Sequence, residues 1–135
     1  MTGPALSDVL LDTNVLSPLF DRRPRSLPLT LVDRELVVPF VVLAELAVGL
    51  SALGSGRREL ADRVLDGLTV AYADGATVQR WVDVTVWSRE HGHPIHQARH
   101  SNDRWIVAVA LAYELPLASS DRIFDGLPGL SHFEM

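Results

Sequence analysis

Cysteine and lysine are both absent from the 135-residue chain. Without cysteine, the protein has neither disulfide bonds nor a cysteine-ligated zinc site. Apolar runs stay far below the roughly 20 residues of a transmembrane helix; the longest ones lie at 36–44 and 105–113. No basic residue precedes the first apolar run, so a signal peptide is not expected. We therefore expect a cytoplasmic protein that has no membrane partner.

The balance of charge bears on possible nucleic-acid binding. The formal net charge is −5, from 12 basic and 17 acidic residues, which at first argues against a nucleic-acid partner. However, every basic residue is arginine, which binds phosphate through paired hydrogen bonds, although a GC-rich genome would give the same bias. Acids gathered around a metal ion would also have their charge offset locally.

Strand-like and helix-like segments alternate along the chain. Short apolar runs predict buried strands at 8–12, 36–38, 68–71 and 117–119, with a last edge strand at 131–134. Helical patterns lie between them, at 15–20, 29–34, 40–50, 57–67, 74–90 and 101–114. This alternation predicts one domain over residues 1–135, an α/β three-layer sandwich with a four- or five-stranded, mainly parallel sheet flanked by helices.

The spacing of apolar residues predicts which helix faces point inward. In helix 57–67 and just after it, these residues are Leu60, Val64, Leu65 and Leu68. In the helix that Asp74 caps, they are Val78, Trp81, Val82, Thr85 and Val86. The helix capped by Ser101 or Asn102 would bury Trp105, Ile106, Val109 and Ala112. The tryptophans are accordingly interpreted as core residues rather than as base-stacking residues.

Four acids come from segments that such a fold brings to one edge of the sheet. Asp12 ends the first strand and Asp121 follows the fourth. Asp103 lies in the first turn of a helix that begins at this edge, and Glu45 lies one to two turns into the helix after the second strand. Open α/β sheets bind ligands outside the carboxyl ends of their strands. We therefore expect the four carboxylates to share a pocket.

Carboxylates that lie so close repel one another, and their charge must be relieved. Raised pKa values would neutralise some of them. Alternatively, Mg²⁺ or Mn²⁺ would bind them, because hard cations prefer oxygen ligands. A set made only of carboxylates favours the metal. Metal ions in such a site activate water for phosphodiester cleavage, so the pattern predicts a metal-dependent hydrolase.

Each acid also has a purely structural explanation. Asp12 and Asp103 would equally serve at the start of a helix, and Asp121 would serve in a turn. Asp125 is an alternative to Asp121 as the fourth acid. Glu45 is the most informative, because an acid among otherwise apolar residues from Phe40 to Leu50 is costly unless it is used.

The motifs around these acids resemble those of the PIN-domain ribonucleases, most closely the VapC toxins of bacterial VapBC toxin–antitoxin pairs. The matching segments cover nearly the whole chain in the family's order and spacing; they are Leu10–Asn14, Leu43–Leu46 with Gly49-Leu50, Asn102–Ala108 and Leu117–Asp121. Two positions depart from the family pattern. Ser119 stands where the family usually has threonine, and Ile123 stands where it often has a further aspartate.

The resemblance implies a Mg²⁺- or Mn²⁺-dependent endoribonuclease whose catalytic and metal-binding acids are Asp12, Glu45, Asp103 and Asp121. Asn14 and Ser119 would be polar residues around one or two metal ions. The implied partners are an RNA substrate, a second copy of the chain in a homodimer, and a small antitoxin. The antitoxin tail would occupy an apolar groove between helix 40–50 and the loop that carries Leu27 and Leu29.

Two other interpretations use the same acids. One is a catalytically silent PIN-like module that only binds RNA or an antitoxin. The other is a phosphatase or a DNA nuclease, which would differ in its substrate alone. Metal-dependent RNA cleavage separates a ribonuclease from the silent module, and the choice of substrate separates it from the phosphatase and the DNA nuclease.

Histidines and arginines form further clusters. The segment with His91, His93, His96 and His100 has irregular spacing, which favours a solvated loop over a zinc site. If this loop lies near Asp103, it could contact RNA, with Arg99 on a phosphate. The remaining clusters are Arg22, Arg23 and Arg25, for phosphate binding or solubility, and Arg57, Arg58 and Arg63, on a solvent-facing helix side.

Overall fold

A computed structural model describes residues 8–20, 31 and 33–134 of the chain. The predicted loop with Arg22, Arg23 and Arg25 lies outside the described residues, as do Leu27, Leu29 and much of the predicted helix 29–34.

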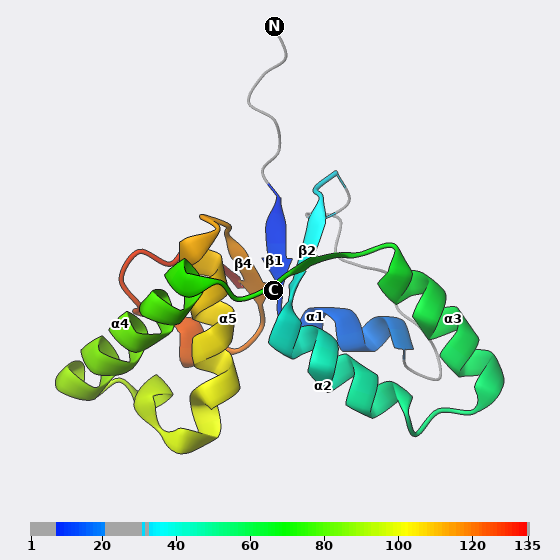
Figure 1. The fold of residues 1–135 in the computed structure, drawn as a ribbon, viewed down its shortest axis with the longest axis horizontal. Coiled ribbons are helices and arrows are strands. Elements are labelled where there is room, and N and C mark those ends of the chain that lie inside the picture. The colour runs from blue at the N-terminus through cyan, green and yellow to red at the C-terminus, as the bar shows by residue number, and fades with distance from the viewer. Residues whose placement is uncertain (1–7, 21–30, 32, 135) are drawn as a thin grey trace, which may run out of the picture.

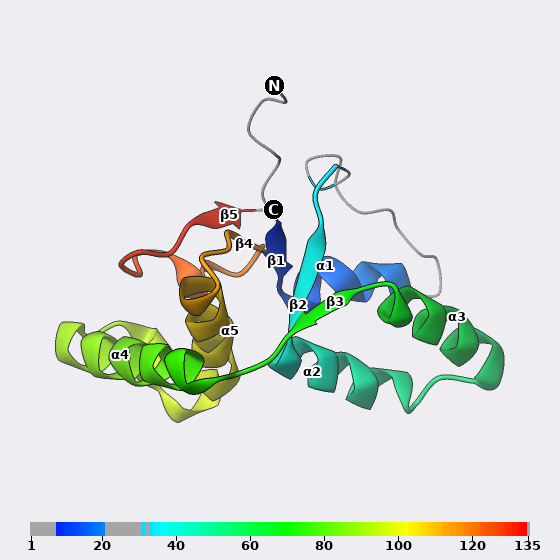
Figure 2. The same ribbon diagram turned by 45° about the horizontal axis from the view of Figure 1, so that its top comes forward.

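The central sheet has five parallel strands in the order β3-β2-β1-β4-β5. The strands are β1 Val9–Leu11, β2 Leu36–Pro39, β3 Thr69–Ala71, β4 Leu117–Ser119 and β5 His132–Glu134, seen across the molecule in Figure 2. Leu10 on the middle strand pairs with Val37 on one side and with Leu117 on the other. The three residues of β1 are fully buried, as a continuous apolar run requires in a sheet covered on both faces. The predicted α/β fold is therefore confirmed, with five strands.

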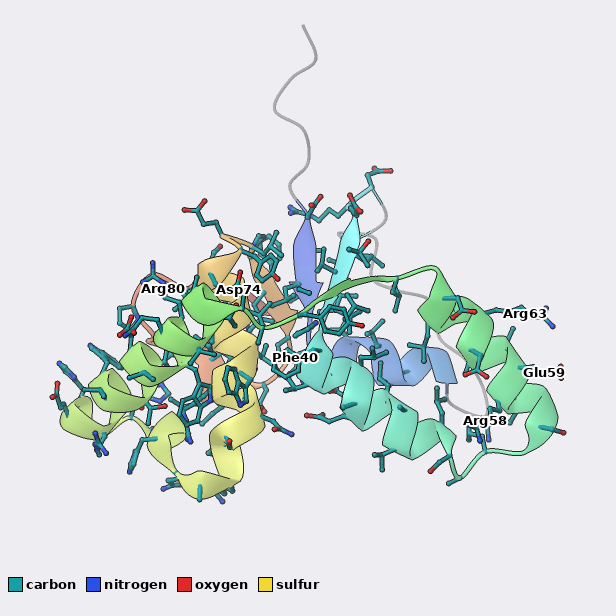
Figure 3. All side chains as sticks on the ribbon, viewed as in Figure 1. Phe40, Arg58, Glu59, Arg63, Asp74 and Arg80 are labelled. Atoms are coloured by element: carbon teal, nitrogen blue, oxygen red, sulfur yellow. The ribbon has the colours of Figure 1, made fainter. Side chains whose placement is uncertain are left out.

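The helices are α1 Thr13–Leu16, α2 Phe40–Leu50, α3 Ser55–Asp66, α4 Gly75–His91 and α5 Ser101–Ala112. Figure 1 shows α4 and α5 side by side in one half of the molecule and α1, α2 and α3 in the other. Phe40 at the start of α2, labelled in Figure 3, contacts Trp105 of α5 edge to face, with ring centres 5.7 Å apart. Across the described ranges, none of the helices has the length and apolar character of a membrane span.

The inward faces of α3 and α4 differ in part from the prediction. Leu65 and Leu68 pack against the core as predicted, and Trp81 is partly buried, but other predicted residues are exposed. Val78, Val82 and Val86 are 47%, 41% and 36% exposed, and the buried residues of α4 are Thr77, Val84 and Ser88. Trp81 stacks on Trp105 of α5 at 5.2 Å, which turns the neighbouring row of α4 inward and leaves the valines at the surface. In α3, likewise, Leu60 is 56% exposed and Ala61 is buried. Arg58 and Arg63 of α3, both labelled in Figure 3, are exposed, as predicted.

The starts of the two long helices α4 and α5 show how local sequence sets their boundaries. Asp74 caps α4 as predicted, and its carboxylate accepts hydrogen bonds from the backbone and side chain of Thr77 at 2.9 Å. The predicted cap of α5 by Ser101 or Asn102 is wrong, because α5 begins at Ser101 itself. A 3₁₀ turn, Ala98–His100, runs directly into α5, and the backbone N–H of Ser101 donates to the carbonyl of Ala98. The turn therefore replaces a side-chain cap.

Glu114, just after α5, has a left-handed backbone conformation with φ of 54°. The backbone N–H of Leu115 donates to Ala110 and that of Glu114 to Leu111, which is the hydrogen-bond pattern of a helix that ends in a Schellman motif. Glycine is the residue usually found at this position, because a side chain there is strained.

Replacing Glu114 with glycine is expected to raise the free energy of unfolding by about 0.5–1 kcal/mol, since glycine relieves the strain at the cost of a more flexible unfolded chain. Urea denaturation of the purified protein measures this change. Glu114→Ala is the matched control, because alanine removes the carboxylate but keeps the strain. Equal stability of the glycine and alanine variants would show that the backbone conformation at this position stores no strain.

Candidate functional site

All four predicted acids lie at the carboxyl edge of the sheet. Asp12 follows β1, Asp121 follows β4, Asp103 lies in the first turn of α5 and Glu45 lies in α2. The negative charges of Asp103 and Glu45 act on Asp12, and those of Asp121 and Glu45 act on Asp103. The structure therefore brings together four carboxylates from four separate segments.

Asp12 is the most buried of these acids, with 6% of its surface exposed. Its carboxylate accepts hydrogen bonds from the backbone of Thr13 at 2.7 Å and from the Ser119 hydroxyl at 2.7 Å. Burial raises the pKa of Asp12; these two hydrogen bonds oppose the rise, and the charges of Asp103 and Glu45 add to it. The donors around Asp12 are neutral, so they orient the carboxylate without cancelling its charge.

Asn14 and Ser119, the two predicted supporting residues, link the ends of β1 and β4. The Asn14 amide donates to Asp12 at 3.2 Å and to the Ser119 hydroxyl at 3.3 Å. In turn, the backbone of Ser120 donates to Asn14 at 3.3 Å, and that of Asp121 donates to Ser119 at 3.0 Å. Because this network needs only the hydroxyl of Ser119, serine serves it as threonine would.

Glu45 is exposed, so the expectation that it would be a costly acid inside an apolar helix is wrong. α2 buries Val41, Val42, Leu46 and Leu50, whereas Glu45, one turn after Val41, is exposed. Its carboxylate nevertheless accepts hydrogen bonds from the Thr13 hydroxyl at 2.7 Å and from the Asn102 amide at 3.3 Å. Those two residues are neighbours of Asp12 and Asp103 in the chain, so their contacts tie Glu45 to both acids.

Thr13 and Asn102 are site residues that the sequence did not single out as partners of Glu45. Thr13 follows Asp12 and Asn102 precedes Asp103 in the chain. This adjacency is the only sign in the sequence that they belong to the site. Only the folded structure shows that they meet on Glu45, because the contacts join residues 32 and 57 positions apart.

Asp103 is partly buried and Asp121 is exposed. Burial raises the pKa of Asp103; its hydrogen bond with His100 opposes the rise, and the charges of Asp121 and Glu45 add to it. Asp121 also accepts a hydrogen bond from the backbone of Ile123 at 2.9 Å, which is the turn role considered from the sequence. Asp125 instead contacts His132 at 3.2 Å, so the geometry favours Asp121 over Asp125 as the fourth acid.

The donor chemistry of this edge fits a hard divalent cation. Asp12 and Asp103 both carry raised pKa values, which a cation would reverse by stabilising the charged carboxylates. Among residues 8–20, 31 and 33–134, no three acidic or histidine side chains stand close enough to hold an ion by themselves. Mg²⁺ suits such an arrangement, because it typically uses one or two carboxylates and retains several of its waters.

Two cavities lie on different sides of the molecule. A cavity of about 220 Å³ includes Glu45 but not Asp12, Asp103 or Asp121, so it is not the shared pocket expected from the sequence; it is lined by Thr13, Ser17, Glu45, Leu46, Gly49, Leu50 and Leu53. A larger one of about 600 Å³ lies near the amino ends of β2, β4 and β5 and includes Arg34, Arg80, Glu114 and Phe133 among its lining residues. The larger cavity contains none of the four acids. The chemistry of the carboxylates, rather than cavity size, therefore locates the candidate site.

The fold and this edge define a class: parallel α/β proteins with an acidic centre at the carboxyl ends of the strands. The model of the PIN domain family matches residues 9–130. The chain therefore belongs to the PIN domain family, as its motifs predicted.

Similar proteins give the comparison more detail. Ribonuclease VapC5 of Mycobacterium tuberculosis is 30% identical over 139 residues, covering 99% of this chain and 96% of that protein. VapC ribonuclease Y4jK of Sinorhizobium fredii is 28% identical over 124 residues, covering 84% of this chain and 86% of that protein. The crystal structure of the toxin–antitoxin system VapBC-5 of M. tuberculosis matches with a TM-score of 0.73 and 26% identity, over 98% of this chain and 100% of that one.

Proposed function

We propose that this chain is a divalent-metal-dependent endoribonuclease that acts as the toxin of a toxin–antitoxin pair. The observation that carries the proposal is the meeting of four carboxylates at one sheet edge of a PIN-domain chain. The names of the relatives support it, since they are VapC ribonucleases, and the similar crystal structure is that of a toxin–antitoxin system. An RNA substrate and an antitoxin of the same cell are consistent with a cytoplasmic location.

Asp12 and Asp103 would hold Mg²⁺ or Mn²⁺, with Glu45 and Asp121 as the outer acids of the same centre. The cation, when bound, lowers the pKa of water and neutralises charge on the scissile phosphate. Ser119 and Asn14 keep the Asp12 carboxylate in one orientation through their hydrogen bonds. This description applies to one ion or to two.

Glu45 and Asp121 are exposed, so an RNA backbone can approach the centre from their side. Thr13 and Asn102 hold the two oxygens of Glu45, which limits the side chain's movement while it remains open to solvent. Glu45 is therefore placed to accept a proton or to orient a water at the open side of the centre.

The antitoxin and the second copy of the chain have candidate surfaces. The 220 Å³ cavity has apolar walls from Leu46, Leu50 and Leu53 next to Glu45, which suits an apolar antitoxin segment that ends in a basic group. Val48 on the same helix is 73% exposed. On α4, the exposed valines 78, 82 and 86 form an apolar row of the kind that a homodimer would cover.

The proposal is tested by incubating the purified protein with mixed cellular RNA and with single-stranded DNA, in Mg²⁺ or Mn²⁺ and with EDTA. We expect internal cleavage of RNA that either metal supports, that EDTA removes and that re-added metal restores. Cleavage of neither RNA nor DNA under any metal condition would favour the silent binding module. Cleavage of DNA without RNA would favour the DNA nuclease.

A further inference from the structure

The histidine-rich segment between α4 and α5 is largely exposed, as expected for a solvated loop, but it is folded. It contains two 3₁₀ turns, Pro94–His96 and Ala98–His100, and Ile95 in the first of them is fully buried. His93 accepts a hydrogen bond from the backbone of Ile95 at 3.1 Å, and its Nε2 lies 2.7 Å from the carbonyl of Asp125. These contacts give the segment a fixed path into α5.

Arg104 fastens this segment from the side of α5. Its guanidinium donates to the carbonyls of Ile95 at 2.7 Å and Gln97 at 2.9 Å, and it lies over the Trp81 ring at 4.9 Å. Arg104 is only 5% exposed. Although Arg104 follows Asp103 directly in the chain, it therefore directs its donors to backbone carbonyls and leaves the acid to another partner.

That partner is His100, at the end of the fastened segment. Its Nδ1 lies 2.6 Å from Oδ2 of Asp103, and the two side chains are 17% and 25% exposed. An N–H donor at this distance forms a strong hydrogen bond with a carboxylate. Because one oxygen of Asp103 is held, the plane of its carboxylate and the direction of its other oxygen are set as well.

We propose that His100 is a positioning residue that fixes the Asp103 carboxylate for divalent-cation binding, a role that rests on the proposed metal-dependent function. The other acids are held in the same manner, Asp12 by Ser119 and Glu45 by Thr13 and Asn102. The histidine-rich segment thus has a function. Arg104 holds it in place, and its last residue, His100, supplies the hydrogen-bond donor for the Asp103 carboxylate. Such outer partners typically change metal affinity about 10–100-fold when they are removed.

The test compares Mn²⁺ affinity, measured by calorimetric titration at one pH, among three substitutions of His100. In His100→Asn, the side-chain nitrogen lies as many bonds from Cα as Nδ1 does, so it can donate to Asp103. In His100→Gln the nitrogen lies one bond farther out, and in His100→Ala the donor is missing. We expect the glutamine and alanine variants to bind Mn²⁺ about 10–100-fold more weakly, and the asparagine variant to bind nearly as tightly as the wild type.

His91→Ala is the control, because His91 is an exposed histidine that contacts Trp87 at the end of α4. Its Mn²⁺ affinity is expected to equal that of the wild type. Wild-type affinity in His100→Ala, or an asparagine variant as weak as the alanine variant, would overturn the role of His100 while leaving wild-type RNA cleavage as support for the proposed function. A wild-type protein that neither binds Mn²⁺ nor cleaves RNA would overturn both.

Discussion

Replacing Asp103 or Asp12 with asparagine is expected to reduce metal-dependent RNA cleavage to the background of the assay while leaving the fold intact. Asparagine has nearly the same shape and can still accept hydrogen bonds from His100 or Ser119. It removes the negative charge that a cation requires. At position 12 it also caps a helix about as well as aspartate does.

Stability separates a metal-binding role from a structural one. Burial and neighbouring acids raise the pKa of both carboxyls, so at neutral pH the folded state contains charges that it disfavours. Removing either charge is therefore expected to leave the melting temperature in EDTA unchanged or higher. In Mg²⁺ the wild type is expected to gain stability through ligand binding, and the two asparagine variants are expected to lose that gain.

Asp74→Asn is the matched control, since Asp74 caps α4 (Figure 3) and is not one of the four acids. It replaces a capping aspartate in the same way and is expected to cleave RNA as the wild type does. Cleavage that persists in both Asp12→Asn and Asp103→Asn would contradict the acidic centre. A marked loss of stability in EDTA would instead assign these acids a structural role.

Arg104→Met is expected to lower the free energy of unfolding by about 3 kcal/mol, because the carbonyl of Ile95 in a buried hydrogen bond and that of Gln97 in a partly buried one lose a charged donor. Burial lowers the pKa of the Arg104 guanidinium, but arginine stays charged at neutral pH. Methionine fills much of the volume over Trp81 without supplying hydrogen bonds. Guanidinium chloride denaturation measures the change, and RNA cleavage is expected to fall as well, since the segment that carries His100 loses its anchor.

Arg99→Ala is the control, because it tests whether removing any arginine of this region lowers the free energy of unfolding as much as Arg104→Met does. Arg99 is exposed in the 3₁₀ turn before α5, so its removal is expected to change stability by less than about 0.5 kcal/mol. Arg104→Met with a stability equal to that of Arg99→Ala would show that the segment does not depend on Arg104.

The sheet and its acidic edge could be predicted because they depend on local patterns. Short apolar runs marked β1, β2 and β4, and the alternation with helices placed their carboxyl ends together. Asp12, Asp103 and Asp121 followed from that placement. Glu45 was identified because an acid among apolar residues was expected to be costly. That reason is partly wrong, since Glu45 is exposed on its helix.

What the sequence did not reveal depends on contacts between distant elements. The buried residues of α4 include the polar Thr77 and Ser88, so apolar spacing pointed to the exposed valine row instead. Contacts such as the stacking of Trp81 on Trp105 set which row faces inward. The burial of Arg104 was not predicted. The buried face of α5 is wider than the stripe of an amphipathic helix, and it includes this arginine as well as the apolar residues. The partnership of His100 with Asp103 depends on two consecutive 3₁₀ turns, which irregular histidine spacing did not predict.

The most direct measurement of the acidic centre is the anomalous scattering of crystals of the wild-type protein soaked in Mn²⁺. The proposed function predicts a manganese peak at the carboxyl edge of the sheet, bound directly or through one water by Asp12 and Asp103, and its absence in crystals of Asp103→Asn. A manganese peak only elsewhere, such as beside His91 or His96, would contradict the assignment, as would the same peak undiminished in Asp103→Asn.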